Sequence, residues 1–270
     1  MGEASVNQKR VEIVRIREHA RRIAFRSSLP DFYKDFAWAT HKSGQIFETD
    51  ALIAQLRGYV AGHLENDFGH GLKHSVKVTL DAGALMLIEQ NNSESLPLKQ
   101  GLEKKEAESR HRGVIIVQCA GLLHDLKRKE KDHAIKGAEY ARKILRDYPL
   151  SKNEVEVICL AIRNHEAFKE VLETDSSEGL LVSDCLYDAD KFRWGPDNFT
   201  DTVWEMISFS QIPLSKFMAL YPKGMESLAR IKDTFRTRTG KKYGPQFIDI
   251  GLVIGEELYE VIKTEFAQFL

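Results

Sequence analysis

The sequence contains little cysteine. Among its 270 residues there are three cysteines, Cys119, Cys159 and Cys185, and each lies inside an apolar stretch. Their number is odd and no two form a CxxC pair, which argues against both a disulfide framework and a zinc ribbon. We therefore expect free thiols in a reducing compartment such as the cytoplasm.

Long apolar runs are also missing. No stretch approaches the ~20 apolar residues that a membrane-spanning helix needs, and residues 1–22 lack the apolar centre of a secretion signal. Gly2 follows Met1, but Val6 stands where an acylation motif has Ser or Thr. We expect no membrane partner, no lipid anchor and a cytoplasmic protein.

No charge of one sign dominates the chain. Its 39 Lys and Arg residues against 40 Asp and Glu residues give a formal net charge of -1. A protein that binds the nucleic-acid backbone usually carries a basic field, so general nucleic-acid binding is not expected. The sequence also lacks a GxSxG elbow and a GxxxxGK(S/T) loop, which argues against a serine hydrolase and a P-loop enzyme.

Apolar residues recur at helical spacing almost throughout the chain. Val155, Ile158, Cys159 and Ile162 are one example, and no set of alternating strands stands out. Turn signals divide the chain into about ten helices. The charged stretch 101–112 is expected to be a solvated helix face or loop. We predict an all-α protein in the form of a compact multi-helix bundle, with an N-terminal helical extension (1–60), a central domain (61–210) and C-terminal helices packed on it (211–270).

An acidic residue interrupts each of two apolar segments. Residues 113–123 carry no charge, and His124 and Asp125 follow them directly. The segment GLLVSDCLYDADK contains Asp184, Asp188 and Asp190. A buried carboxylate is costly unless a cation or hydrogen bonds compensate it, so the two segments favour one shared cation. A carboxylate that caps the next helix is the competing interpretation of Asp125.

Four histidines supply further candidate ligands. His70 and His74 are four residues apart and would share one face of a helix. His133 opens the segment HAIKGAEYARKIL, and His165 lies three residues after Ile162 on an apolar stripe. Imidazole and carboxylate together suit zinc, iron, nickel or manganese. Taken singly, each histidine is more often a hydrogen-bonded core residue than a ligand.

The order His74, His124-Asp125, Asp190 resembles the H…HD…D signature of the HD superfamily of metal-dependent phosphohydrolases. The segments GHGLKHSVKV, LLHDLKRKEKDHAIKGAEYARKIL and LYDADK resemble the family's local contexts, over about residues 68–194. The resemblance implies a helical HD domain that binds divalent metal and hydrolyses phosphate esters, with these four residues as ligands of a first ion. Binuclear members add two histidines, and His133 and His165 stand at the matching positions. One or two ions are therefore expected, with Asp125 bridging them if there are two.

The resemblance also implies how a phosphate ester would be bound and cleaved. A metal-activated hydroxide would attack the phosphorus of a nucleotide or a small phosphorylated metabolite. Asp125, Arg128 and Lys191 are the candidate catalytic residues, and Arg128, Lys191 and His70 are the candidates for substrate binding. Arg128 has the alternative of being an exposed cation, and Lys191 that of pairing with Asp188. The aromatic residues Trp194 and Phe199 are candidates to stack on a ring, or else belong to the core.

The sequence departs from the family pattern at several positions. Lys127 replaces the glycine of HDIG, and Phe192-Arg193 replaces the Leu-Asp of DADKLD. The HHE and GYP signatures of cyclic-dinucleotide phosphodiesterases are missing, which argues against that branch. Two other functions stay open, a diiron oxygenase that uses all six ligands and a non-catalytic sensor of nucleotide or metal. The sequence leaves the oligomeric state open.

Overall fold

The structure, a computed structural model, describes residues 3–63, 71–92 and 103–270 of the chain. Within these ranges the backbone forms helices joined by turns and loops, and no strand occurs. The predicted all-α class is confirmed. The α-helices are α1 (Glu3–Arg26), α2 (Asp31–Asp35), α3 (Ala37–Thr49), α4 (Ala51–His63), α5 (Leu72–Asn92), α6 (Glu103–Leu123), α7 (His133–Ile144), α8 (Lys152–Arg163), α9 (Ser177–Phe192), α10 (Val203–Ser210), α11 (Leu214–Ala229) and α12 (Arg238–Glu265). Three short helical segments lie between them, η1 (Leu145–Asp147), η2 (Asn198–Thr202) and η3 (Arg230–Asp233), and a fourth, η4 (Ala267–Phe269), follows α12.

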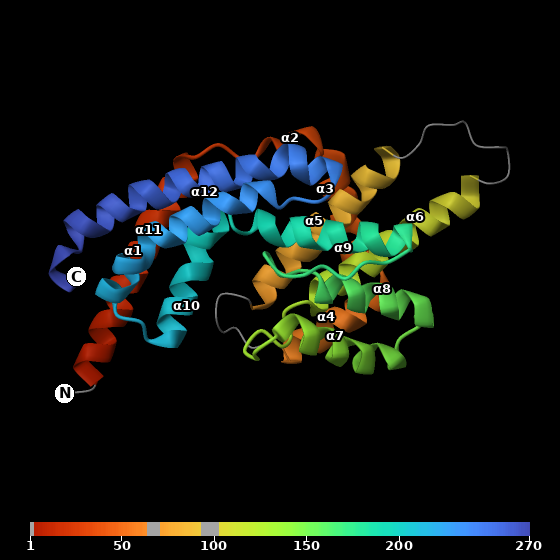
Figure 1. Cartoon of the computed structure of the whole chain (residues 1–270), viewed down its shortest axis with the longest axis horizontal. Helices are drawn as coiled ribbons and strands as arrows, with labels where there is room; N and C mark the ends of the chain where they lie inside the picture. Colours follow the sequence, from red (N-terminus) through yellow and green to blue (C-terminus); the bar gives the residue numbers. More distant parts are fainter. Residues whose placement is uncertain (1–2, 64–70, 93–102) are drawn as a thin grey trace.

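The helices form an elongated bundle (Figure 1). One end contains α5, α6, α8 and α9, which pack against one another, and α7 packs on α8. At the other end α1 and α11 pack on the long helix α12, which also reaches α5 and α9. The start of α1 and the end of α12 therefore lie at the same end of the molecule. The exact boundaries 1–60, 61–210 and 211–270 stay a prediction.

Helix α6 has an exposed first half and a buried second half. Most residues of 104–111 are exposed, whereas all of 113–123 are buried. The solvated helix face predicted for the charged stretch is confirmed for its described residues. The buried half delivers His124 and Asp125 into the centre of the bundle, which is the costly location that the sequence indicated.

Gly121 allows α5 and α6 to approach each other closely near His74 and His124. A Cβ atom on Gly121 would lie 2.8 Å from the Cα atom of Thr79 on α5. Such a contact with backbone requires glycine at this position. The close crossing brings the first turn of α5, with His74, next to the end of α6, with His124.

The end of α9 explains the departure from the family's Leu-Asp pair. The Phe192 ring stacks on Phe247 of α12, with centroids 4.1 Å apart. The buried Arg193 donates hydrogen bonds to Asp81, to Asp197 at 2.6 Å and to Tyr33 at 2.7 Å. Asp81 lies on α5, Tyr33 lies on α2 and Asp197 follows α9. Phe192 and Arg193 therefore fix the end of α9 in place.

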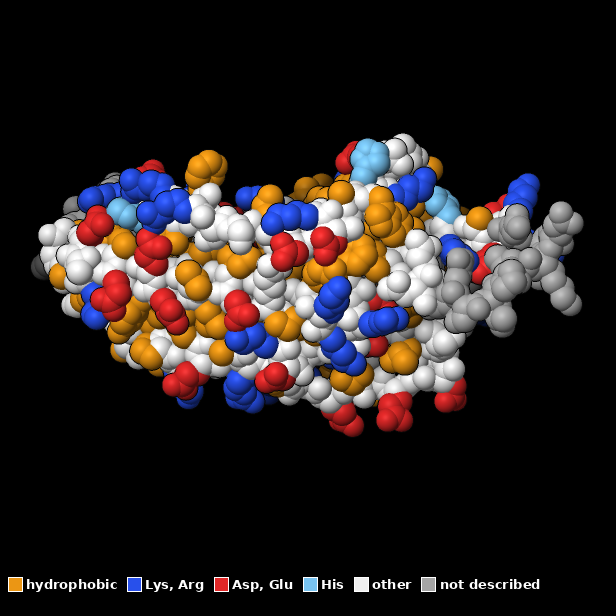
Figure 2. Space-filling view, turned by 90° about the horizontal axis from the view of Figure 1, so that it is seen from above, with side chains coloured by type: hydrophobic (Ala, Val, Ile, Leu, Met, Phe, Trp, Pro, Cys, Tyr) orange, Lys and Arg blue, Asp and Glu red, His pale blue; other side chains and the backbone are white. Residues whose placement is uncertain are grey.

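The upper face of the molecule mixes charges of both signs. Figure 2 shows Lys and Arg side chains interspersed with Asp and Glu, and hydrophobic side chains between them. This pattern agrees with the small net charge of -1.

Cys119, Cys159 and Cys185 are buried free thiols, as predicted. None of the helices in the described ranges is both long enough and apolar enough to cross a membrane.

An ion pair joins α6 to the start of α8. Arg112 donates to both carboxylate oxygens of Glu154, at 2.5 and 3.1 Å. Glu154 also closes a capping box with Ser151 at the first turn of α8. The hydrogen bond from Arg112 lowers the pKa of Glu154 to about 2, although partial burial acts in the opposite direction.

This pair is expected to make stability depend on acid pH. Because the folded pKa of about 2 lies below the usual 4.5, its stabilisation is complete above pH 4.5 and is lost as the pH falls toward 2. We expect the free energy of unfolding of the wild type to exceed that of Glu154→Gln by about 1 kcal/mol at pH 7, since the pair is partly screened by solvent. Urea unfolding at several pH values measures the difference, and Glu156→Gln, in a more exposed pair with Arg142, is the control. A difference that stays constant down to pH 2.5 would contradict this assignment.

Candidate metal centre

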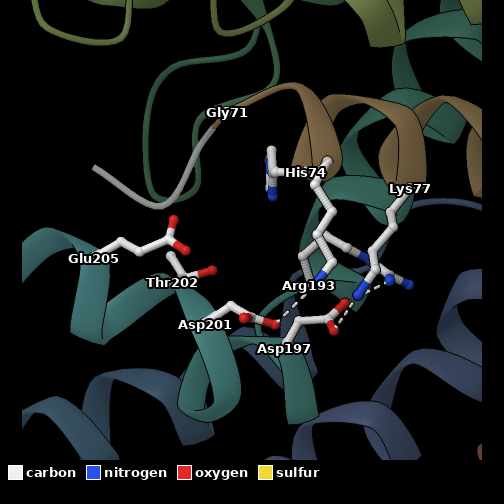
Figure 3. A pocket seen from close by; sticks show the side chains of 9 residues that line it. Gly71, His74, Lys77, Arg193, Asp197, Asp201, Thr202 and Glu205 are labelled. Carbon is white, nitrogen blue, oxygen red and sulfur yellow. Dashed lines mark hydrogen bonds and ion pairs between the residues drawn. The ribbon is translucent and has the colours of Figure 1, made fainter. Parts of the chain in front are cut away.

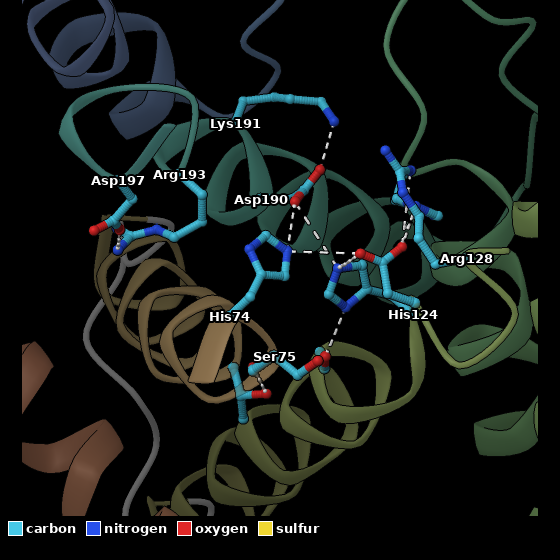
Figure 4. Close-up of polar contacts among 12 residues, drawn as sticks. His74, Ser75, His124, Arg128, Asp190, Lys191, Arg193 and Asp197 are labelled. Atoms are coloured by element: carbon cyan, nitrogen blue, oxygen red, sulfur yellow. Dashed lines mark hydrogen bonds and ion pairs between the residues drawn. The ribbon is translucent and has the colours of Figure 1, made fainter. Parts of the chain in front are cut away.

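Two histidines and two carboxylates meet where α5, α6 and α9 converge (Figure 4). His74 lies in the first turn of α5, His124 and Asp125 follow α6, and Asp190 lies near the end of α9. His74 Nε2 is 3.3 Å from Asp190 Oδ1 and 3.7 Å from Asp125 Oδ2. His124 Nε2 is 3.3 Å from Asp125 Oδ2 and 3.9 Å from Asp190 Oδ1. The structure thus brings together the four residues that the sequence proposed for a first ion.

The spacing of these donor atoms suits a metal ion. Four donors at about 2.1 Å from one tetrahedral ion lie about 3.4 Å from one another. The separations between the imidazole nitrogens and the carboxylate oxygens, 3.3 to 3.9 Å, lie close to this value. The side chains are also almost fully shielded, with exposed fractions of at most 8%. A cation therefore fits both the geometry and the charge of the group.

The tautomer of His124 favours the same conclusion. Its Nδ1 lies 2.7 Å from the carbonyl oxygen of Gly121 and must donate, because a carbonyl only accepts. In the neutral ring Nε2 then carries a lone pair, and within the described residues it makes no hydrogen bond of acceptable geometry. Burial lowers the pKa of His124, but the carboxylates of Asp125 and Asp190 outweigh burial and raise it. The backbone contact of Nδ1 therefore holds the ring with Nε2 toward the carboxylates.

The other carboxylate oxygen of Asp125 faces a second group of side chains, which consists of His133 and His165. Asp125 Oδ1 lies 3.8 Å from His133 Nε2 and 3.5 Å from His165 Nε2, and these two nitrogens are 3.2 Å apart. Both histidines are buried. His133 begins α7, as predicted. His165 was expected on the helix itself but lies two residues beyond the end of α8 at Arg163, because Asn164 ends the helix and binds Leu172 and Ser183 with its side chain.

The two Nε2 atoms of the second group are both hydrogen-bond acceptors. His165 Nδ1 donates to the carbonyl oxygen of Ile162 at 2.6 Å, which leaves Nε2 as an acceptor. Arg128 Nη1 lies 2.8 Å from His133 Nε2 and can only donate, so this nitrogen is also an acceptor. Burial lowers the pKa of His133 to about 3, helped by His165 and Arg128. A neutral imidazole is the form that binds metal.

Two cationic side chains adjoin the carboxylates (Figure 4). Lys191 is buried and donates to Asp190 Oδ2 at 2.5 Å. Burial acts to raise the pKa of Asp190, but Lys191 and the two histidines hold it well below its usual value. Arg128 is one-third exposed, at 32%, and its Nη1 lies 4.0 Å from Asp125 Oδ1. Arg128 therefore stands at the edge of the cluster and Lys191 inside it.

The contacts of Lys191 and Asp188 differ from one expected alternative. Lys191 pairs with Asp190 and not with Asp188. Asp188 instead accepts hydrogen bonds from the backbone N–H groups of Arg236 and Thr237, both at 2.8 Å. Asp188 therefore fixes the start of α12 and takes no part in the cluster. This partner comes from a segment about fifty residues away in sequence, which helical periodicity does not reveal.

The comparison with known families agrees with this geometry. Residues 71–194 match the family model described as the HD domain. This part of the chain is an HD domain. The match includes all the described residues of both groups, His74, His124, Asp125, His133, His165 and Asp190. Searches of curated proteins and of solved structures found no match to the chain.

The HD domain accounts for the coarse chemistry of the site. Members of the HD domain family are generally metal-dependent phosphohydrolases. Two buried groups in the described residues have the composition to hold an ion, His74 with His124 and Asp125, and Asp125 with His133 and His165. Asp125 belongs to both groups. Lys127, in place of the family's glycine, is absent from the residues with positive φ, so the turn does not need glycine there.

Three further candidates from the sequence are His70, Trp194 and Phe199. His70 falls outside the described residues. Phe199 is a core residue, only 4% exposed. The prediction that it stacks on a substrate ring is therefore wrong. Trp194 is half-buried, and its ring lies 5.4 Å from Lys191 Nζ. Of the two aromatic candidates, Trp194 alone is near the cluster.

A charged pocket that was not predicted from the sequence lies beside His74 (Figure 3). Its volume is about 120 Å³. Arg193 and Asp197 lie on the side of His74 that faces away from His124 (Figure 4). Lys77 donates to Asp197 at 2.5 Å across the pocket. The spacing of Lys73 and Lys77 was the available signal, but their acidic partners follow α9 and are remote in sequence. The lining residues are Gly71, Lys73, His74, Lys77, Arg193, Asp197, Asp201, Thr202 and Glu205.

Proposed function

We propose that this HD domain hydrolyses a phosphate ester of a nucleotide or another small phosphorylated metabolite, with one or two divalent transition-metal ions. The observation that carries the proposal is the position of Asp125. Its two carboxylate oxygens face two different groups of buried histidines. Arg128 adjoins Asp125, and Lys191 adjoins the neighbouring carboxylate of Asp190. A metal cluster with nearby cations is suited to a phosphoryl group, which is anionic.

The residues present define which side chains would hold the metal. His74, His124, Asp125 and Asp190 would bind a first ion, and Asp125, His133 and His165 would bind a second. Iron, manganese, nickel and zinc all suit imidazole and carboxylate. When bound, such an ion lowers the pKa of water and polarises a phosphoryl oxygen.

The protein's own groups would orient the phosphate. Lys191 is held rigidly by burial and by Asp190, so its ammonium group is a fixed positive charge toward one phosphoryl oxygen. Arg128 is partly exposed and has the planar guanidinium that binds two oxygens at once. Backbone contacts at Gly121 and Ile162 fix the rings of His124 and His165. The cluster is thereby organised before substrate arrives.

The six-ligand set also fits a diiron oxygenase, which would use His133 and His165 in the same way. Lys191 and Arg128 favour the phosphohydrolase, because cations beside the carboxylates suit an anionic substrate.

A reducing compartment such as the cytoplasm is compatible with the three buried thiols.

A panel of phosphomonoesters, phosphodiesters and nucleotides tests the proposed activity on metal-loaded protein. We expect release of inorganic phosphate or of a phosphomonoester from at least one class. Bound iron with oxygen consumption, and no hydrolysis, would point to the oxygenase instead. Saturable nucleotide binding with no turnover of any compound would point to a sensor and contradict the hydrolase.

A further inference from the structure

Arg128 contacts the nitrogen of His133 that a cation in the second group would also need. Its Nη1 lies 2.8 Å from His133 Nε2, and that nitrogen is 3.2 Å from His165 Nε2. Arginine keeps its positive charge at every ordinary pH. The guanidinium therefore satisfies the lone pair of His133, which a second metal ion would also need. One lone pair binds one partner, so the two cations exclude each other at this nitrogen.

The charge balance around Asp125 strengthens this competition. The carboxylates of Asp125 and Asp190 are balanced by Lys191 and Arg128, and the histidines are neutral when they bind metal. The first divalent ion already leaves the cluster positively charged. A second divalent ion would add two more positive charges within a few ångströms of Arg128, where screening by water is limited. Movement of the guanidinium, or arrival of an anion, would relieve the repulsion.

Arg128 has the freedom to move, and Lys191 does not. The Arg128 side chain is 32% exposed, against 3% for Lys191. Its neighbour Lys127 is engaged elsewhere, 3.3 Å from Glu130 and over the Tyr140 ring. A phosphate dianion offers Arg128 two charged acceptors, a stronger partner than one neutral imidazole nitrogen. A phosphate at the cluster would therefore draw the guanidinium away from His133.

We propose that Arg128 is a positioning residue that controls occupancy of the second metal site. With no phosphate bound it holds His133 and keeps the cluster mononuclear. When phosphate binds, Arg128 turns to the anion and releases His133 for a second ion at His133, His165 and Asp125. Binding of phosphate and of the second ion is then mutually reinforcing, because linkage between two ligands is reciprocal. The proposal rests on the proposed function for its substrate, but it concerns metal occupancy and not turnover.

Titration with Mn²⁺ tests this directly, with free Mn²⁺ counted by electron paramagnetic resonance. We expect one tight equivalent in the wild type and two in Arg128→Ala, with the second bound at least tenfold more tightly than in the wild type. The double variant Arg128→Ala/His133→Ala should return to one equivalent, which locates the added ion. Lys127→Ala removes the same charge one position earlier and should behave as the wild type. Circular dichroism confirms that each variant is folded.

Inorganic phosphate supplies the second arm of the experiment. Saturating phosphate should tighten the second Mn²⁺ in the wild type about tenfold and change it much less in Arg128→Ala, where no guanidinium has to leave. Equal stoichiometry and affinity in the wild type and Arg128→Ala would overturn the inference and leave the first metal site intact. A wild type that binds no Mn²⁺ at all would overturn the metal centre itself and the inference with it.

Discussion

Asp125→Ala is expected to abolish phosphate-ester hydrolysis and to empty the metal centre. The carboxylate is 2% exposed and faces His74 and His124 with one oxygen and His133 and His165 with the other. Its removal takes away the ligand common to both groups and leaves Asp190 as the one remaining carboxylate of the cluster. We expect kcat to fall more than ~10³-fold, the scale seen when a central catalytic group is deleted. Metal analysis and phosphate release on the same preparation measure both effects.

Glu130→Ala is the matched control for this variant. Glu130 lies in the same turn but pairs with Lys127 and Lys136 at the surface. It should keep wild-type metal content and activity. If Asp125→Ala is folded and retains both its metal and its rate within twofold of the wild type, Asp125 is a capping residue and not a ligand.

Lys191→Met is expected to separate metal binding from turnover. The ammonium group is buried and bonded to Asp190, so its loss removes a positive charge that would face the phosphoryl group. We expect kcat to fall by ~10²-fold, as when one preorganised electrostatic group is removed from an active site. The metal should stay bound, because the change removes a competing cation from Asp190. Steady-state kinetics and metal analysis together test the prediction.

Lys127→Met provides the corresponding control, since Lys127 lies at the surface in contact with Glu130 and Tyr140. Unchanged kcat and KM in a folded Lys191→Met protein would show that Lys191 serves only as a partner of Asp190. Loss of metal in parallel with activity would show that it supports the ligand and does not act on substrate.

Local sequence features predicted the fold class and the membership of the cluster well. The charge-free run before His124 indicated a buried helix that ends in two polar groups, and the structure has this arrangement. The order of His74, His124-Asp125 and Asp190 and their local contexts led to the HD family. Such features are readable because helical periodicity and the cost of a buried carboxylate act on neighbouring residues.

Features that depend on distant partners were not predictable in the same way. Asp188 and Asp190 lie two residues apart in the same apolar segment, yet Asp188 binds the backbone at Arg236 and Thr237 and Asp190 joins the cluster. The family signature selected Asp190, but the role of Asp188 follows from the packing of α12 on α9. The contact of Arg128 with His133 has the same origin, because it depends on the path of the turn between α6 and α7.

Removal and return of the metal from the wild-type protein tests the central claim most directly. The protein is treated with a chelator, dialysed, analysed for metal and assayed for phosphate release before and after a divalent ion is added back. We expect activity to fall to background when the metal is removed and to recover when about one equivalent or more of the ion is returned, since the ion supplies the activated water. Full activity in protein shown to be free of metal would contradict the account.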